Sequence, residues 1–109
     1  MSYNIFSTRR FEKELKRLVK KYPSLKLEYF ELVTELTKKP DTGTLIGKSC
    51  YKIRLAIASK GKGKSGGARV ITHWYITTQS VYLLTIYDKA EKTDLKPNEL
   101  VDLIDSLEL

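Results

Sequence analysis

Several residue types are scarce in this chain, and each scarcity narrows the range of functions. One cysteine among 109 residues excludes an internal disulfide and a cysteine-rich metal cluster. A single histidine at a distant position argues against a zinc site. There is no apolar run of about 18 residues, so we expect no contact with a membrane. The first residues lack the apolar stretch of an export signal, so we expect a reduced, cytoplasmic protein.

Carboxylates are absent from the middle of the chain. Residues 42–87 hold seven basic side chains and no Asp or Glu, although the whole chain has 20 Lys and Arg against 13 Asp and Glu. Metal-dependent nuclease chemistry needs clustered carboxylates, which this segment does not supply. Its cations have no local partners, so we expect them to be solvated or to meet an external polyanion. The plain alternative is that the charge only keeps a small domain soluble.

The apolar spacing in the first half of the chain is mostly helical. Residues 3–6 are expected to form a short edge strand. Apolar side chains then recur on one helical face over 8–21, and again from Pro23 to about residue 38. The two segments predict an antiparallel helical hairpin, with Pro23 in the first turn of the second helix. The chain length suits one domain, to which we assign residues 1–109.

In the second half of the chain the apolar spacing changes to the period of a strand. It predicts a strand, a Gly/Lys/Ser loop, two strands of a hairpin and a final helix that has Pro97 in its first turn. These segments lie at residues 51–57, 58–67, 68–77, 81–87 and 97–107. The predicted fold class is α+β: an N-terminal two-helix hairpin packed on a small, mainly antiparallel β-sheet, with a C-terminal helix.

Cationic side chains are expected to gather on one surface of this sheet. Strand alternation projects Lys52 and Arg54 to one face, and Arg69 opens the next strand. Adjacent strands lie about 4.8 Å apart, so the three cations are predicted to share a concave surface. The intervening loop adds three lysines at alternate positions: Lys60, Lys62 and Lys64. The alternative for this loop is a solvated hairpin tip.

The same loop contains the string A-x-x-x-x-G-K-S, which nearly matches the phosphate loop of nucleoside triphosphatases. In those proteins a helix follows, and its N-terminus meets the phosphates. Here a predicted strand follows from Ala68, and residues 42–87 supply no Mg²⁺-binding aspartate. We therefore reject the triphosphatase interpretation.

The segment after the last predicted strand returns mixed charges to the edge of the basic surface. Tyr87, Lys89 and Glu91 are candidates for proton transfer to bound phosphate, and the alternative is a solvated loop. His73 and Cys50 are most simply structural residues, since no Cys–His geometry is indicated. Some of the interleaved aromatics are candidates for stacking on unpaired RNA bases.

Two motifs carry a family resemblance: S-K-G-K-G-K-S-G-G-x-R at 59–69, and Y-x-K-x-E-x-x-D-L at 87–95. They resemble the RelE/HigB toxins of bacterial type II toxin–antitoxin systems, and the HigB-like branch fits best. The preceding helical hairpin agrees, so the resemblance covers nearly the whole chain. It implies a RelE-like fold and a ribosome-dependent mRNA endonuclease that needs no cofactor. It also implies two partners: a cognate antitoxin protein, and the ribosome with its A-site mRNA and ribosomal RNA.

The resemblance implies roles for individual residues as well. The catalytic candidates are Arg69, Lys52, Arg54, Lys89, Glu91 and Tyr87. The candidates for RNA binding are Lys60, Lys62, Lys64 and His73. His73 enters because Thr72-His73 stand where relatives often have two aromatics. The gyrase poisons of the ParE type share the fold, so a non-nuclease toxin and a simple RNA-binding module remain alternatives.

The chemistry expected from these residues is attack of a ribose 2′-hydroxyl on the adjacent phosphate, without metal. Arg69, and secondly Arg54, would stabilise the added negative charge of the transition state. Lys52 or Lys89 would act as the base, with Glu91 as the rival base. Tyr87 would be a proton donor, and the sequence does not choose among these assignments.

Overall fold

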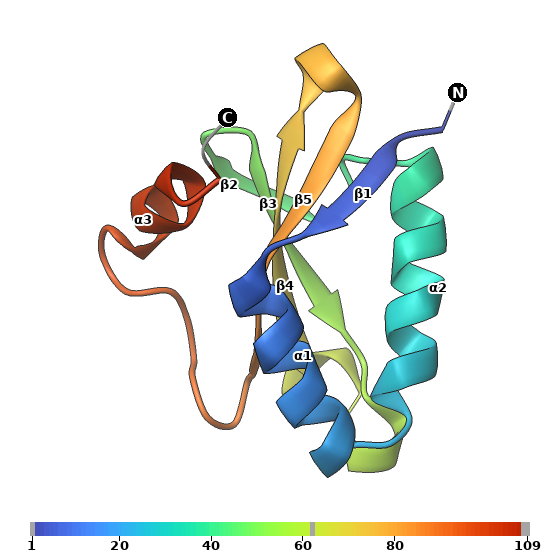
Figure 1. Ribbon diagram of the computed structural model, residues 1–109. Coiled ribbons are helices and arrows are strands. Elements are labelled where there is room, and N and C mark those ends of the chain that lie inside the picture. Colours follow the sequence, from blue (N-terminus) through green and yellow to red (C-terminus); the bar gives the residue numbers. More distant parts are fainter. Residues whose placement is uncertain (1, 62, 108–109) are drawn as a thin grey trace.

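The computed structural model describes residues 2–61 and 63–107 (Figure 1). Its helices and strands follow the order β1 (Asn4–Ser7), α1 (Arg9–Lys21), α2 (Leu25–Lys38), β2 (Thr44–Gly47), β3 (Cys50–Leu55), β4 (Ala68–Tyr75), β5 (Ser80–Asp88) and α3 (Glu99–Asp105). The strands form one five-stranded sheet in the order β1-β5-β4-β3-β2. Only the β1–β5 pair among them is parallel, which confirms the predicted α+β class with a mainly antiparallel sheet.

The helical hairpin is set by local sequence signals. Thr8 caps α1, because its hydroxyl oxygen accepts the Phe11 N–H at 3.1 Å. The same hydroxyl donates to the Leu84 carbonyl at 3.2 Å, which ties the start of the helix to β5. Pro23 lies in the turn between the helices rather than inside the second one, since α2 begins at Leu25. This corrects the predicted start of that helix by two residues.

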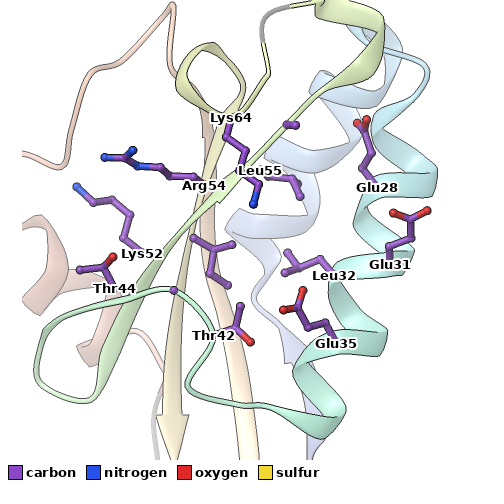
Figure 2. Close-up of a pocket in the computed structure, with 13 residues that line it drawn as sticks. Glu28, Glu31, Leu32, Glu35, Thr42, Thr44, Lys52, Arg54, Leu55 and Lys64 are labelled. Carbon is purple, nitrogen blue, oxygen red and sulfur yellow. The ribbon is translucent and has the colours of Figure 1, made fainter.

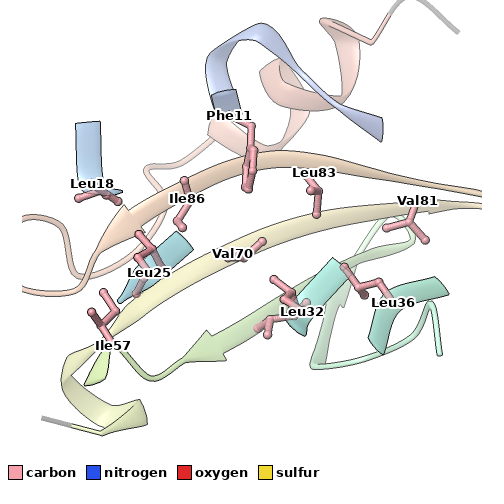
Figure 3. Close-up of a cluster of buried hydrophobic side chains, with 12 residues drawn as sticks. Phe11, Leu18, Leu25, Leu32, Leu36, Ile57, Val70, Val81, Leu83 and Ile86 are labelled. Carbon is pink, nitrogen blue, oxygen red and sulfur yellow. The ribbon is translucent and has the colours of Figure 1, made fainter. Parts of the chain in front are cut away.

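The helices α1 and α2 cover one face of the sheet (Figures 1 and 3). Their inward side chains and those of the central strands form the main core: Phe11, Leu18, Leu25, Leu32, Leu36, Ile53, Ile57, Val70, Val81, Leu83 and Ile86. The spacing that predicted the helices therefore also selected the residues that are buried. This face, which we call the helix face, leaves the opposite face of the sheet for α3 and for solvent.

The short helix α3 packs on the opposite face, which we call the open face. Leu103 of α3 is buried there with Ile71, Leu84 and Cys50. Pro97 precedes the helix, which begins at Glu99, so its predicted place in the first turn is wrong. None of the helices in the described part of the chain is long and apolar enough to span a membrane.

The strand β2 was not predicted. It forms a hairpin with β3 whose two turn residues, Lys48 and Ser49, have φ of 53° and 59°. Such turns normally carry Asn-Gly, because both central residues must adopt positive φ. The hairpin formed by β4 and β5 is confirmed, although β4 ends at Tyr75 and residues 76–78 form a short 3₁₀ turn.

The register between β4 and β5 shifts at a bulge between Ile71 and Thr72. Glu14 of α1 reaches the sheet here, where it accepts the Thr85 hydroxyl at 2.7 Å and the Ile86 N–H at 3.3 Å. These bonds fix α1 against the part of β5 that leads to Tyr87.

Candidate functional site

Three side chains lie in one row across the open face of the sheet. Arg54 of β3 is directly opposite Arg69 of β4, and Arg69 is directly opposite Tyr87 of β5. Residues paired in this way project to the same face with Cβ atoms about 5 Å apart. Like charges directly opposite each other are destabilising. The two arginines have no ion pair within the described residues, so the row is suited to an external anion.

Lys52 extends this cationic row by one step along β3, since residues two apart on a strand share a face. Its Nζ lies 3.3 Å from Oδ1 of Asp94, which comes from the segment between β5 and α3. The Leu95 N–H and Lys52 lower the pKa of Asp94, so this carboxyl is ionised at neutral pH. Both side chains are reachable from solvent, and an incoming phosphate would compete with Asp94 for Lys52.

Arg69 holds the base of the loop that joins β3 and β4. Its Nη1 donates to the carbonyls of Lys64 at 2.8 Å and of Ala68 at 3.1 Å. Its Nη2 donates to the carbonyl of Ser65 at 3.3 Å. The residue is only 5% exposed, although no carboxylate of the described chain pairs with it. These bonds use three of the five N–H groups and leave Nε–H and one Nη2–H for another acceptor.

Tyr87 is the third member of the row and is also nearly buried, at 5% exposed. Its hydroxyl has no hydrogen-bond partner among the described residues. Burial, and secondarily the charge of Asp94, raises the pKa of Tyr87, so the phenol is neutral at pH 7 and able to donate a proton. A buried polar atom without a partner is costly, and such atoms often mark a position where a ligand completes the bonding.

A groove of about 610 Å³ runs beside the free half of β3 (Figure 2). β2 pairs only as far as Lys52, so residues 53–55 have β4 on one side and no strand on the other. Figure 2 shows Lys52 and Arg54 pointing away from α2. The far wall carries three acidic side chains of α2: Glu28, Glu31 and Glu35. These acids repel a polyanion, so an RNA backbone is favoured on the side of Arg54 and disfavoured beside α2.

The expected role of Lys60 in binding RNA is not supported. Its ammonium forms a buried ion pair with Asp88, which follows Tyr87 on β5 and points to the helix face. Tyr22 donates to the same carboxylate at 2.7 Å, and the Ala90 N–H donates at 2.9 Å. Burial alone would raise the pKa of Asp88, but hydrogen bonds from Lys60, Tyr22 and Ala90 lower it to about 2. The expectation that the cations of residues 42–87 are solvated or meet an external polyanion is therefore wrong for Lys60, and Lys52 also has an acidic partner from beyond this segment.

Glu91 also lies away from the row, so we withdraw it as the rival base. Arg17 of α1 binds its carboxylate through two bonds of 2.7 and 3.2 Å, and Lys21 lies 3.6 Å away. The bonds from Arg17 lower the pKa of Glu91, which makes it a weaker base. Lys89 has a different contact: its Nζ donates to the carbonyl of Thr93, the residue before Asp94, at 3.0 Å.

The remaining RNA-binding candidates have different surroundings. His73 is 9% exposed, and its Nδ1 lies 3.4 Å from the sulfur of Cys50, so it packs in the sheet and is not presented to RNA. Burial lowers the pKa of His73, which keeps it neutral. Lys64 is exposed at the edge of the groove. Lys62 lies outside the described residues.

Two residues near the site were missed from the sequence. Strand alternation places Asp88 on the face opposite Tyr87, and this period-two signal was available from the sequence. Asp94 belongs to the motif at 87–95, but no local spacing links it to Lys52, 42 positions earlier. Within residues 2–61 and 63–107, no three His, Cys, Asp or Glu side chains are placed to hold a metal ion.

Comparison with solved structures identifies the architecture. A mutant of the E. coli toxin RelE in the free state covers 96% of this chain and 93% of its own, with a TM-score of 0.61 and 18% identity. The isolated E. coli RelE toxin covers 99% and 100%, with a TM-score of 0.62 and 18% identity. This chain has the RelE fold.

The E. coli RelBE toxin–antitoxin complex matches the same fold. The alignment covers 80% of this chain and 96% of the solved one, with a TM-score of 0.62 and 19% identity. No protein-family model matches the sequence. At identities this low RelE shares the fold with this chain, and the activity of the chain rests on its own side chains.

Proposed function

We propose that this protein is the toxin of a type II toxin–antitoxin pair and that it cleaves mRNA on the ribosome. The observation that carries the proposal is the Arg54–Arg69–Tyr87 row on the open face of a RelE-like sheet. Two cations without ion pairs in the described chain and one buried hydroxyl without a partner lie side by side there. Together they suit one phosphodiester, which needs positive charge at its oxygens and a proton at its leaving group. Bound RNA must uncover Arg69 and Tyr87, which are each 5% exposed in the free protein.

The proposed reaction uses the RNA's own nucleophile. The ribose 2′-oxygen forms a bond to phosphorus while the bond from phosphorus to the 5′-oxygen breaks. The products are a 2′,3′-cyclic phosphate and a 5′-hydroxyl, and no metal ion takes part in the balance. Arg54 and the free N–H groups of Arg69 stabilise the negative charge that grows on the non-bridging oxygens.

Two protons move in this reaction. Tyr87 is the donor to the departing 5′-oxygen, because its raised pKa keeps the phenol protonated. The base that takes the 2′-hydroxyl proton is Lys52, two residues from Arg54 on β3, or Lys89, two residues after Tyr87. Lys52 forms an ion pair with Asp94, which an incoming phosphate must break before this amine can act, whereas Lys89 contacts the neutral Thr93 carbonyl.

The first test is to induce the protein in cells and map new RNA ends. The proposal predicts 5′-hydroxyl ends within translated mRNA, their loss when ribosomes are kept off the message, and no damage to DNA. A ParE-like gyrase poison would damage DNA and leave mRNA intact, and a simple RNA-binding module would produce neither result. Either of these patterns would contradict the proposed nuclease.

The partner and branch are part of the same proposal. RelE is solved in complex with its antitoxin RelB, and we propose that this chain has an antitoxin of its own. Co-purification with the product of the neighbouring gene, followed by inhibition of RNA cleavage by that product, tests this assignment. The HigB-like branch stays a prediction, since the solved relatives reported above are RelE proteins.

A further inference from the structure

One contact of Tyr87 has no part in the reaction proposed so far. The ammonium of Lys92, from the segment between β5 and α3, lies over the Tyr87 ring, 5.4 Å from the ring centroid. A cation in this position is attracted by the negative charge on the face of the ring. Lys89 and Lys96 belong to the same segment, but in the described chain neither ammonium lies over a ring of the row. This contact therefore distinguishes Lys92 from the neighbouring lysines.

A turn directly after β5 brings Lys92 back to Tyr87. The carbonyl of Asp88 accepts the N–H groups of Glu91 and Lys92, both at 3.0 Å. The carboxylate of Asp88 accepts the Ala90 N–H at 2.9 Å. These bonds fix the backbone between the end of the strand and Lys92, so the main chain itself sets where this lysine begins.

The far end of the Lys92 side chain is anchored by Glu99, the first residue of α3. The ammonium lies 2.6 Å from Oε2 of Glu99, and Arg10 of α1 donates to the same oxygen at 2.7 Å. The Lys96 N–H donates to the other oxygen at 2.8 Å. Burial alone would raise the pKa of this carboxyl, but the bonds from its three donors lower it to about 2. Glu99 is therefore ionised at neutral pH and, at 12% exposed, provides a fixed anchor for the ammonium.

The orientation of the Tyr87 hydroxyl depends on contacts of its ring. The hydroxyl has no hydrogen-bond partner among residues 2–61 and 63–107, so no bond at the oxygen sets its direction. The ring belongs to the buried cluster that contains Ile71, Leu84 and Leu103. Apolar packing of this kind is attractive but has no preferred direction. The cation over the ring face does have one, and it is the polar contact that fixes the tilt of the phenol.

We propose that Lys92 is a positioning residue for Tyr87: its ammonium, anchored by Glu99, holds the ring so that the hydroxyl faces the bound phosphodiester. This inference rests on the proposed nuclease and adds one residue to its active site. Lys92 takes no proton and contacts no RNA in this role. Its loss should therefore slow proton donation by Tyr87 and leave the binding of RNA unchanged.

Two other roles for Lys92 fit less well. A phosphate bound at its ammonium would also lie beside the Glu99 carboxylate, whose negative charge would repel it. A purely structural ion pair between Lys92 and Glu99 would not explain why the ammonium also lies over the Tyr87 ring. The three roles predict different kinetics, because direct RNA binding affects KM and a structural pair affects the folded fraction.

The first test is the rate of mRNA cleavage on purified ribosomes. Lys92→Met keeps the aliphatic stem and removes the charge, so it should lower kcat about tenfold and change KM less than about twofold. Lys92→Arg keeps a cation that can lie over a ring, and it should recover kcat to within about threefold of wild type. Lys96→Met is the matched control, because Lys96 is exposed and its side chain forms no ion pair in the described chain. It should change kcat less than about twofold.

A double-mutant cycle shows whether Lys92 acts through Tyr87. The Tyr87→Phe variant keeps the ring and lacks the hydroxyl, so there is no proton donor left to position. Adding Lys92→Met to this variant should lower the remaining kcat by less than about twofold. A further tenfold loss would show that Lys92 acts on another part of the reaction, and it would overturn the proposal.

The contact itself is measured in the free protein by NMR with isotope-labelled tyrosine. The ring signals of Tyr87, assigned by their loss in Tyr87→Phe, should shift in Lys92→Met and stay in place in Lys96→Met. Unchanged ring signals would overturn the proposal, as would an unchanged kcat in Lys92→Met, a loss confined to KM, or no recovery in Lys92→Arg. A wild-type protein that leaves mRNA intact while the ring signals respond as expected would refute the proposed nuclease, and the positioning role with it. The failure of the nuclease and the failure of the contact are thus distinguished.

Discussion

The buried ion pair between Lys60 and Asp88 gives the sharpest prediction on stability. Replacing Lys60 with methionine keeps most of the aliphatic stem and removes the charge. Asp88 is fully buried, and it would keep only the Tyr22 hydroxyl, the Ala90 N–H and the more distant Lys21 ammonium. Removing one partner of a buried pair costs about 3–5 kcal/mol. Because these neighbours remain, we expect the lower end, about 3 kcal/mol at pH 7.

The same pair predicts how this loss depends on pH. The pKa of Asp88 is about 2 in the folded protein and about 3.9 in an unfolded chain, so ionisation contributes about 2–3 kcal/mol of stability at pH 7. A depressed pKa means that this contribution is present above pH 4 and is lost as the pH falls toward 2. Without Lys60, only Tyr22 and Ala90 oppose the effect of burial through hydrogen bonds, so the pKa of the carboxyl should move up toward its unfolded value and acid should weaken the variant less through this group. The difference between wild type and Lys60→Met should therefore narrow by at least about 1 kcal/mol at pH 3.

Urea denaturation followed by the fluorescence of Trp74, the only tryptophan, measures both quantities. Lys64→Met is the matched control, because Lys64 is an exposed lysine of the same loop whose side chain forms no ion pair in the described chain. It should cost less than about 0.5 kcal/mol. A loss below 1 kcal/mol in Lys60→Met, or a loss that is the same at pH 7 and pH 3, would refute the buried pair.

Three other predictions concern separate parts of the molecule. Glu91→Gln should leave the rate of RNA cleavage within about twofold, because Arg17 holds this carboxylate away from the row; a hundredfold loss would restore Glu91 as a base. Cys50 should react with a thiol reagent at least about a hundredfold faster in urea than in the native protein, because burial raises its pKa to about 11; equal rates would show that it is accessible. Ser49→Gly should raise the free energy of unfolding by about 1 kcal/mol, because it relieves a positive φ of 59° in the β2–β3 turn; a loss of stability would contradict that backbone conformation.

The sequence predicted those helices and strands for which the apolar periodicity and the residues that begin or end an element indicate the same boundaries. α1 begins at Thr8 and α2 ends near Pro40, because a capping threonine and a proline stand beside regular apolar spacing. The strand β2 was not predicted, because the turn between β2 and β3 has the sequence Lys48-Ser49. Turns in which both central residues have positive φ usually carry Asn-Gly. Pro97 was placed inside α3 because the apolar spacing of the helix is the same whether the helix begins near Pro97 or at Glu99.

The candidate site was likewise predicted only in part. Alternation along β3, together with the start of β4, was enough to bring Lys52, Arg54 and Arg69 to one face. Strand alternation did not predict the ion pairs of Lys60 with Asp88 and of Glu91 with Arg17, because the partners come from distant segments of the chain. Ion pairs between elements depend on packing, which no local pattern encodes.

The most direct measurement of the central claim is the rate of mRNA cleavage on purified ribosomes by the Tyr87→Phe variant. The lost hydroxyl has no partner in the described chain, so the free energy of unfolding should change by less than about 1 kcal/mol. Cleavage should nevertheless fall about a hundredfold or more, whereas Tyr82→Phe on the same strand should stay within about threefold. A stable Tyr87→Phe protein that cleaves as fast as wild type would contradict the claim that this row is the active site.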